Sequence, residues 1–126
     1  MNKQCIETPR APAALGAYSQ GVRIGNLIFV SGQIPLNPET GELSIHIKDG
    51  TRQCLENVKA ILEAGGSRMD AIVKVTVFLR DMNDFNAMNE VYTTYFPQNP
   101  PARAAVQVAK LPRDAVIEIE AVAVVS

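Results

Sequence analysis

The sequence predicts an α+β fold, in which a single mixed β-sheet carries two helices packed on one face. Three observations lead to this prediction. The chain has 126 residues, of which 47% are apolar and 20% charged, a composition typical of one globular domain. Runs rich in β-branched residues predict strands, and apolar side chains at spacings of three and four predict two helices. A chain of this length buries about two-thirds of its surface on folding, so we expect residues 1–126 to form one domain.

The predicted elements follow one another as strands, helix, strand, helix and strands, after an irregular start that contains two prolines. No internal repeat or flexible linker interrupts this order. In sequence, the elements are a hairpin of strands 21–24 and 27–31, an exposed loop over 34–43, a helix over 47–64, a strand over 72–79, a helix over 81–96, and strands over 103–110 and 116–125.

Turn-forming residues separate the elements of the first half. Gly25-Asn26 suits a tight hairpin because both residue types tolerate positive φ. Pro35 and Pro38 cannot donate to a sheet, so the segment that contains them is expected to be an exposed loop. Gly65-Gly66 follows the last apolar residues of helical spacing and predicts the end of the first helix.

In the second half, residues 72–79 read IVKVTVFL and predict a well-buried central strand. Its faces are expected to carry Val73, Val75, Val77 and Leu79 on one side and Ile72, Lys74, Thr76 and Phe78 on the other. Pro97 ends the second helix, whose methionines and tyrosines from Met82 to Tyr95 are expected to form core. A turn over residues 111–114 joins the last two strands, which we expect to be neighbours.

The last strand predicts that the domain associates with copies of itself. Two helices cover only one side of a sheet, yet this strand is apolar on both. One side carries Ile117, Ile119, Ala121 and Ala123, and the other side carries Val116, Val122 and Val124. Because the chain has no further helix to cover the second side, self-association is the simplest explanation.

Composition argues against several classes of partner. Twelve basic and thirteen acidic residues give a net charge of −1, which leaves no excess of positive charge for nucleic acid. No apolar stretch is long enough to span a membrane, and the first residues lack the core of a signal peptide, so we expect a cytoplasmic protein. Cys5, Cys54 and His46 form no metal-binding pattern, so we expect two free, packed thiols and no metal or cofactor.

The final strands carry the charged residues that stand out. Glu118 and Glu120 share one face of an otherwise aliphatic strand, and carboxylates are seldom buried without a partner or a task. Arg103 lies at the entry to the neighbouring strand among small residues, where a rigidly held guanidinium can receive a carboxylate through two parallel hydrogen bonds. An ion pair between Arg103 and Glu118, or two solvated charges, explains the same residues without any function.

Weaker signals come from the first third of the chain. Ser31-Gly32-Gln33 ends a strand with a glycine that lets a ligand approach the backbone, although a glycine after a strand is more often just a turn. Tyr18 is placed either to donate a phenolic hydrogen bond at the rim of a pocket or only to pack. No Ser/His/Asp or Cys/His set for nucleophilic catalysis can be assembled.

Taken in order, these residues resemble the reactive intermediate deaminase family, also called YjgF/RidA. The resemblance runs nearly from end to end and rests on four separate segments. They are Ala17-Tyr18-Ser19-Gln20-Gly21, Ser31-Gly32-Gln33-Ile34-Pro35, Lys74-Val75-Thr76-Val77-Phe78, and Pro101-Ala102-Arg103 followed later by Ile117-Glu118-Ile119.

The resemblance implies a chorismate-mutase-like homotrimer, in which three sheets form a central β-barrel and ligand clefts lie between adjacent subunits. It implies hydrolysis of 2-iminobutanoate and 2-iminopropanoate to 2-keto acids and ammonia, without a cofactor. In this reading Arg103 clamps the substrate carboxylate, and Ser31 and Gly32 line the same pocket. Glu118 holds the attacking water, and Tyr18 closes the cleft from its rim.

Two further positions and two rival functions stay open. Asn89 matches a position near the family's pocket. Ala105 stands where close deaminase relatives commonly have cysteine, so a backbone carbonyl and no thiol would line the pocket there, and Ala17 replaces a usual proline. The chain is alternatively a non-catalytic regulatory trimer that binds 2-keto acids, or an endoribonuclease. The acidic composition and the missing basic stripe count against a ribonuclease.

Overall fold

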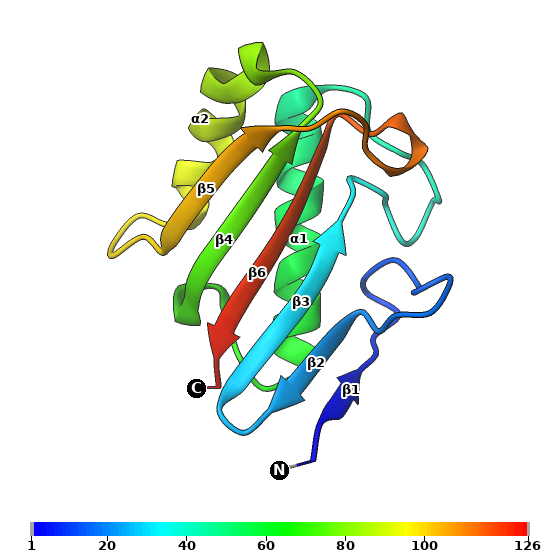
Figure 1. Cartoon of the computed structure of the whole chain (residues 1–126), viewed down its shortest axis with the longest axis vertical. Helices are drawn as coiled ribbons and strands as arrows, with labels where there is room; N and C mark the ends of the chain where they lie inside the picture. The colour runs from blue at the N-terminus through cyan, green and yellow to red at the C-terminus, as the bar shows by residue number, and fades with distance from the viewer. Residues whose placement is uncertain (1, 126) are drawn as a thin grey trace.

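The computed structural model describes residues 2–125, which form a six-stranded sheet and two α-helices (Figure 1). The α+β prediction is confirmed. Short 3₁₀ turns at Met69–Ala71, Met82–Asp84 and Pro112–Asp114 connect some of the elements. The strands are β1 Gln4–Ile6, β2 Gly21–Ile24, β3 Leu27–Gln33, β4 Ile72–Leu79, β5 Ala102–Gln107 and β6 Ile117–Val124, and the helices are α1 Ile47–Ala64 and α2 Phe85–Tyr95.

The order of strands across the sheet is β1-β2-β3-β6-β4-β5. β4 and β5 are parallel and the other neighbours are antiparallel, so the sheet is mixed, as predicted. The chain passes from β3 through α1 to β4, and from β4 through α2 to β5, moving each time toward the same edge. Because such crossovers are right-handed, both helices lie on one face of the sheet, behind it in Figure 1.

The core fills the layer between the helices and the sheet. Alternate residues of β6 point into it, and the apolar face of α1 packs onto them. No helix in the described part of the chain has the length and apolarity needed to cross a membrane. The largest fully buried apolar side chains are Ile28, Leu55, Ile61, Leu62, Leu79, Met88, Ile117, Ile119, Val58, Val75 and Val77.

The predicted bounds of the first helix are confirmed, and those of the second are only partly right. Gly66, which follows α1, has a φ of +90°, the left-handed conformation in which glycine commonly ends an α-helix. Before α2, residues 82–84 form a 3₁₀ turn, and the Asp81 carboxylate accepts a hydrogen bond from the Asn83 N–H at 2.9 Å. Met82 is therefore 40% exposed and does not join the core. The start of the chain, predicted to be irregular, contains β1, which is too short to show an alternating pattern.

The predicted faces of residues 72–79 are wrong at the first positions. A β-bulge between Ile72 and Lys74 adds one residue opposite β6 and reverses the alternation there. Ile72 is therefore buried and Val73 is 46% exposed, the opposite of the prediction. From Val75 to Leu79 the alternation is as predicted.

The last two strands are not neighbours, which contradicts the prediction. β4 lies between β5 and β6 and pairs with both. The physical reason is the α2 crossover, which places β5 parallel to β4 at the edge of the sheet, while β6 fills the gap between β3 and β4. A turn-like sequence between two strands does not distinguish a hairpin from a return across a third strand.

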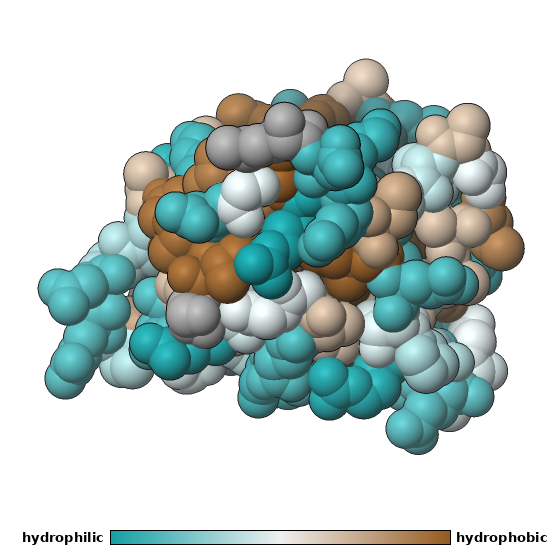
Figure 2. Space-filling model, turned by 90° about the horizontal axis from the view of Figure 1, so that it is seen from below, coloured by the Kyte–Doolittle hydropathy of each residue, from teal (hydrophilic) through white to brown (hydrophobic). Residues whose placement is uncertain are grey.

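The helices leave the other face of the sheet, called the open face below, turned toward the viewer in Figure 1. Apolar cross-strand pairs lie on it: Leu27 is opposite Val124, and Phe29, which is 45% exposed, is opposite Val122. Figure 2 views the end of the molecule where the chain termini lie and shows apolar surface gathered there. Exposed apolar surface of this kind is typical of an interface. Self-association stays a prediction, and the open face is the surface that we expect it to bury.

The two cysteines have different surroundings. Both are free. Cys54 is fully buried on α1, as expected, and burial raises the pKa of its thiol. Cys5 is exposed on β1, so the expectation that it packs is wrong, because the short first strand lies at the edge of the sheet.

Candidate functional site

Arg103 points from β5 toward the helix side of the sheet. Its register partner on β4 is Val75, which is fully buried under the helices. The guanidinium Nη1 donates a hydrogen bond to Asn89 Oδ1 at 2.7 Å. The Arg103 Cζ atom lies 4.7 Å from the centre of the Tyr92 ring and 5.3 Å from the centre of the Phe85 ring. One hydrogen bond and two cation–π contacts therefore fix the direction of this cation.

All three groups that hold the Arg103 guanidinium come from one face of α2. Phe85, Asn89 and Tyr92 are spaced by four and three residues, which places them above one another along a helix. Tyr92 is buried in the core, as predicted, but its contact with Arg103 and that of Phe85 were not predicted. An amide flanked by two aromatic residues at helical spacing was the signal that could have identified this platform.

The charge of Arg103 is not neutralised within the described chain. Its hydrogen-bond partner is a neutral amide, and none of the ion pairs among residues 2–125 includes it. The guanidinium keeps further N–H donors in its rigid plane. Two such donors match the two oxygens of a carboxylate, so this site is suited to hold a small organic anion.

Glu118 lies on the open face of β6, between Ile117 and Ile119, which are buried on the other face. Its carboxyl group occupies the space above Gly32. A Cβ atom at Gly32 would overlap Glu118 Oε2 and would lie 2.8 Å from Glu118 Cδ. The register of β3 against β6 shifts between Val30 and Gln33, so Gly32 lies in an irregular stretch of the strand. Because glycine has no side chain, this position leaves room for the carboxyl group in its observed orientation.

The surroundings of Glu118 favour its protonated form. Partial burial raises the pKa of the Glu118 carboxyl above its ordinary value, and the negative charge of Glu120 raises it further. A carboxyl group whose pKa is closer to neutrality exchanges protons with water more effectively at physiological pH. Glu118 is therefore a candidate for a proton-transfer group.

Arg103 and Glu118 lie on opposite faces of the sheet. Arg103 contacts α2 on the helix side, whereas Glu118 contacts Gly32 on the open face. β4 separates their strands, and neighbouring strands are about 4.8 Å apart, so β5 and β6 are about 10 Å apart. The ion pair that explained these residues without a function is not formed. Within one chain, these two side chains cannot contact the same small molecule.

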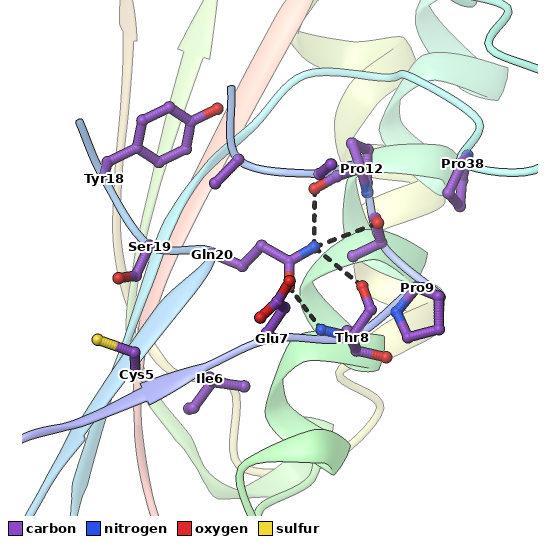
Figure 3. A pocket seen from close by; sticks show the side chains of 13 residues that line it. Cys5, Ile6, Glu7, Thr8, Pro9, Pro12, Tyr18, Ser19, Gln20 and Pro38 are labelled. Atoms are coloured by element: carbon purple, nitrogen blue, oxygen red, sulfur yellow. Dashed lines mark hydrogen bonds between the residues drawn. The ribbon is translucent and has the colours of Figure 1, made fainter. Parts of the chain in front are cut away.

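Tyr18 and Ser31 both lie near the first strands of the sheet. Tyr18 is 54% exposed and lines a cavity of about 730 Å³ next to β1, together with Ser19 and Gln20 (Figure 3). Ser31, expected to line the pocket, donates its hydroxyl hydrogen to the Ser19 carbonyl oxygen at 2.6 Å. Ser31 therefore joins β3 to the segment that carries Tyr18, and only its oxygen lone pairs stay available to a ligand.

The structure thus brings the candidate residues together in two groups. Arg103 and Asn89 meet on the helix side, and Ala105, the residue two positions further along β5, pairs with buried Val77 on the same side. Glu118 and Gly32 meet on the open face. Among the described residues, no group of three or more His, Cys, Asp or Glu side chains is placed to hold a metal ion.

We expect Glu118 to titrate at higher pH than a glutamate in a short unstructured peptide. Protein labelled with ¹³C at the glutamate side-chain carboxyl allows this measurement by NMR, and the signal missing from the Glu118→Gln variant identifies the residue. Replacing Glu120 with glutamine should lower the midpoint, because it removes the neighbouring negative charge. Glu42→Gln, in an exposed loop, serves as the control and should leave the midpoint of Glu118 unchanged. A Glu118 midpoint no higher than that of glutamate in a short unstructured peptide would contradict this account.

Comparison with known proteins places the chain in a family. The family described as Endoribonuclease L-PSP matches residues 8–125, which is almost the whole chain. The chain belongs to the reactive intermediate deaminase (YjgF/RidA) family. The resemblance read from the sequence is confirmed.

Curated relatives in the reactive intermediate deaminase family match along nearly their entire length. A RutC family protein of Pyrococcus horikoshii is 56% identical over 96% of this chain and 97% of the relative. A protein of Escherichia coli named 2-iminobutanoate/2-iminopropanoate deaminase is 52% identical over 94% of this chain and 95% of the relative.

Solved structures of YjgF/RidA proteins share the fold. The crystal structure of Escherichia coli TdcF with bound serine is 51% identical, covers 98% of this chain and 99% of its own, and has a TM-score of 0.94. The structure of the Escherichia coli YjgF gene product has a TM-score of 0.91 at 52% identity, with 96% of this chain and 98% of that chain covered. The predicted chorismate-mutase-like fold of the subunit is therefore confirmed.

Proposed function

We propose that this chain is a deaminase that hydrolyses small 2-imino acids, such as 2-iminobutanoate and 2-iminopropanoate, to 2-keto acids and ammonia. The observation that carries the proposal is the Arg103 guanidinium, fixed by Asn89 and two aromatic rings with its positive charge not neutralised. A 2-imino acid presents a carboxylate next to the reacting C=N bond, so one cation both binds the substrate and orients it. The name of the Escherichia coli relative supports this substrate class.

The active unit in this proposal is a homotrimer with sites between subunits. Arg103 and Glu118 lie on opposite faces of one sheet, so a site that uses both takes them from two chains. The open face carries the exposed apolar pairs that a second copy would bury, and Glu118 lies on that same face. In the proposed trimer this surface is buried between subunits, and each site combines Glu118 of one chain with Arg103 of a neighbour.

Hydrolysis adds one water to the protonated imine and needs three proton transfers. Arg103 holds the substrate carboxylate, and Asn89 fixes the guanidinium. The Glu118 carboxylate accepts a proton from water as the water oxygen bonds to the carbon of the protonated imine and the C=N electron pair moves to nitrogen, which gives a neutral amino alcohol. Glu118 returns this proton to the nitrogen and then accepts the hydroxyl proton as the C–N bond breaks, so that the keto group forms and ammonia leaves. Tyr18 closes the cleft from its rim, Ser31 and Gly32 line it, and the Ala105 backbone completes it near Arg103.

The proposal is tested by generating 2-iminobutanoate with threonine dehydratase and following the loss of the imine signal with and without this protein. Protein that accelerates the decay above the spontaneous rate, with matching ammonia release, supports the deaminase. Saturable binding of 2-ketobutyrate by calorimetry without any acceleration would replace it with the regulatory ligand-binding trimer. Cleavage of RNA by highly purified protein, weakened by salt, would favour the ribonuclease instead.

We expect Gly32→Ala to lower the rate of imine hydrolysis about 10- to 100-fold while the protein stays folded. The new methyl group would overlap the Glu118 carboxyl group, and a flexible glutamate side chain can swing away from it without disturbing the backbone. The rate is measured in the threonine dehydratase assay, and folding by circular dichroism.

The control for Gly32→Ala is the same substitution in a Glu118→Ala background, where no carboxyl group is left to displace. There the added methyl group should have little further effect. Equal losses in both backgrounds would contradict the idea that Gly32 acts by leaving room for Glu118.

A further inference from the structure

We propose that Gln20 is a positioning residue for Tyr18: its side-chain amide closes the base of the segment 13–19 and thereby holds Tyr18 at the rim of the site. The kinetic consequence rests on the proposed function. The structural part is independent of it and can be tested separately.

Gln20 is buried, with 3% of its surface exposed, and its amide is fully bonded to backbone (Figure 3). Its Oε1 accepts a hydrogen bond from the Thr8 N–H at 2.7 Å. Its Nε2 lies at hydrogen-bond distance from three carbonyl oxygens, those of Thr8 at 3.0 Å, Ala11 at 3.2 Å and Pro12 at 2.8 Å. A buried side chain that satisfies so many backbone groups determines how the segment folds, because each group would otherwise be unpaired.

These bonds fix both ends of the segment 13–19. The bond from Gln20 Nε2 to the Pro12 carbonyl joins the residue before the segment to the residue after it. The second end is attached to β3, because Ser31 N–H donates to the Gln20 carbonyl at 2.9 Å and the Ser31 hydroxyl donates to the Ser19 carbonyl at 2.6 Å. Gly32, next to Ser31, lies under Glu118, so the closed base is directly connected to the proposed site.

Between these ends, little else holds the segment. Within residues 2–125, no hydrogen bond joins residues 13–18 to other parts of the chain. Leu15 is 86% exposed, and the Tyr18 ring lies near Gly16, 3.7 Å from where a Cβ would be. The position of a short loop with few internal contacts depends on its base. A displacement of about 1 Å in an active site can lower the rate about 100-fold. The hydrogen bonds of Gln20 at the two ends of this segment therefore affect catalysis through the position of Tyr18.

A fluorescent reporter tests the structural part. The chain contains no tryptophan, so Tyr18→Trp gives a single reporter on the segment. In this background Gln20→Met keeps the size of the side chain and removes its hydrogen bonds. We expect a shift of the emission to longer wavelength and about twofold stronger quenching by acrylamide, because the segment becomes more mobile.

The matched control is Asn57→Leu in the same reporter background. Asn57 is another buried amide, and its Nδ2 donates to the carbonyl oxygens of Ile34 at 3.3 Å and Leu36 at 3.0 Å on a different loop. Loss of this amide should leave the emission and quenching of the reporter unchanged. If Gln20→Met does not fold, Gln20→Asn, which stays polar but cannot reach all three carbonyls, takes its place.

A double-mutant cycle tests the kinetic part. Gln20→Met alone should lower kcat about tenfold or more, whereas in a Tyr18→Ala background it should cost less than about twofold, since the residue that it positions is gone. A residue that only supports the fold would cost the same in both backgrounds.

Either of two results would overturn the inference: unchanged quenching in the Gln20 variant, or equal kinetic losses with and without Tyr18. If the wild-type protein does not accelerate imine hydrolysis, the proposed function fails. The quenching comparison then still decides whether Gln20 holds Tyr18 in place.

Discussion

Replacing Arg103 with alanine is expected to lower kcat/KM for 2-iminobutanoate about 100-fold or more while the fold stays intact. Removing one partner of a close charge pair typically costs about 2–5 kcal/mol, and about 1.4 kcal/mol corresponds to a tenfold change in rate. The fold should lose less, because Arg103 is half-buried and its contacts with Asn89, Phe85 and Tyr92 contribute about 1–2 kcal/mol. The rate is measured in the threonine dehydratase assay, and folding by thermal unfolding and sedimentation.

Arg103→Lys is the matched control for the geometry of the clamp. Lysine keeps the positive charge, but a single ammonium group cannot donate to Asn89 and to both carboxylate oxygens at once. Its loss of kcat/KM should lie between those of wild type and Arg103→Ala, and calorimetric binding of 2-ketobutyrate should weaken in the same order. Normal turnover in a folded Arg103→Ala variant would contradict the proposal that Arg103 binds the substrate carboxylate and orients the substrate.

Local patterns in the sequence predicted the elements whose cause is local. The helix at 47–64 follows from apolar spacing and Gly65-Gly66, and the hairpin follows from Gly25-Asn26 between two β-branched runs. The bulge at Ile72 to Lys74 leaves no local trace, because it depends on how β4 meets β6. The order of the last strands is likewise set by the crossover through α2, which no single segment encodes.

The sequence singled out the candidate residues but did not predict how they are arranged within one chain. Glu118 stood out as a carboxylate in an aliphatic strand, and Arg103 as a guanidinium among alanines, both from composition of their surroundings. The face that each side chain occupies depends on strand register. Because β4 lies between β5 and β6, the Arg103 and Glu118 side chains are separated and do not form the ion pair considered from the sequence. The contacts of Phe85 and Gln20 could be found only in the structure. Phe85 contacts Arg103 on another element, and Gln20 bonds to backbone carbonyl groups, which the sequence does not mark.

Replacing Glu118 with glutamine is expected to lower kcat about 100- to 10,000-fold while 2-ketobutyrate binds nearly as well as to wild type. Glutamine has almost the same size and still forms hydrogen bonds with water, but it cannot accept a proton. Calorimetry therefore separates this variant from Arg103→Ala, which should lose binding as well. Normal kcat in Glu118→Gln would transfer the proton-transfer role to another group.

Mixing these two variants tests the placement of Glu118 and Arg103 in different subunits. A chain with Arg103→Ala still supplies Glu118, and a chain with Glu118→Gln still supplies Arg103, so neighbours of different kinds can build one complete site. After equal amounts are unfolded and refolded together, about one site in four combines two intact residues, and activity should return to about a quarter of wild type. Each variant refolded alone should stay inactive. If mixed oligomers, identified by native mass spectrometry, show no recovery, Arg103 and Glu118 do not form a site between subunits.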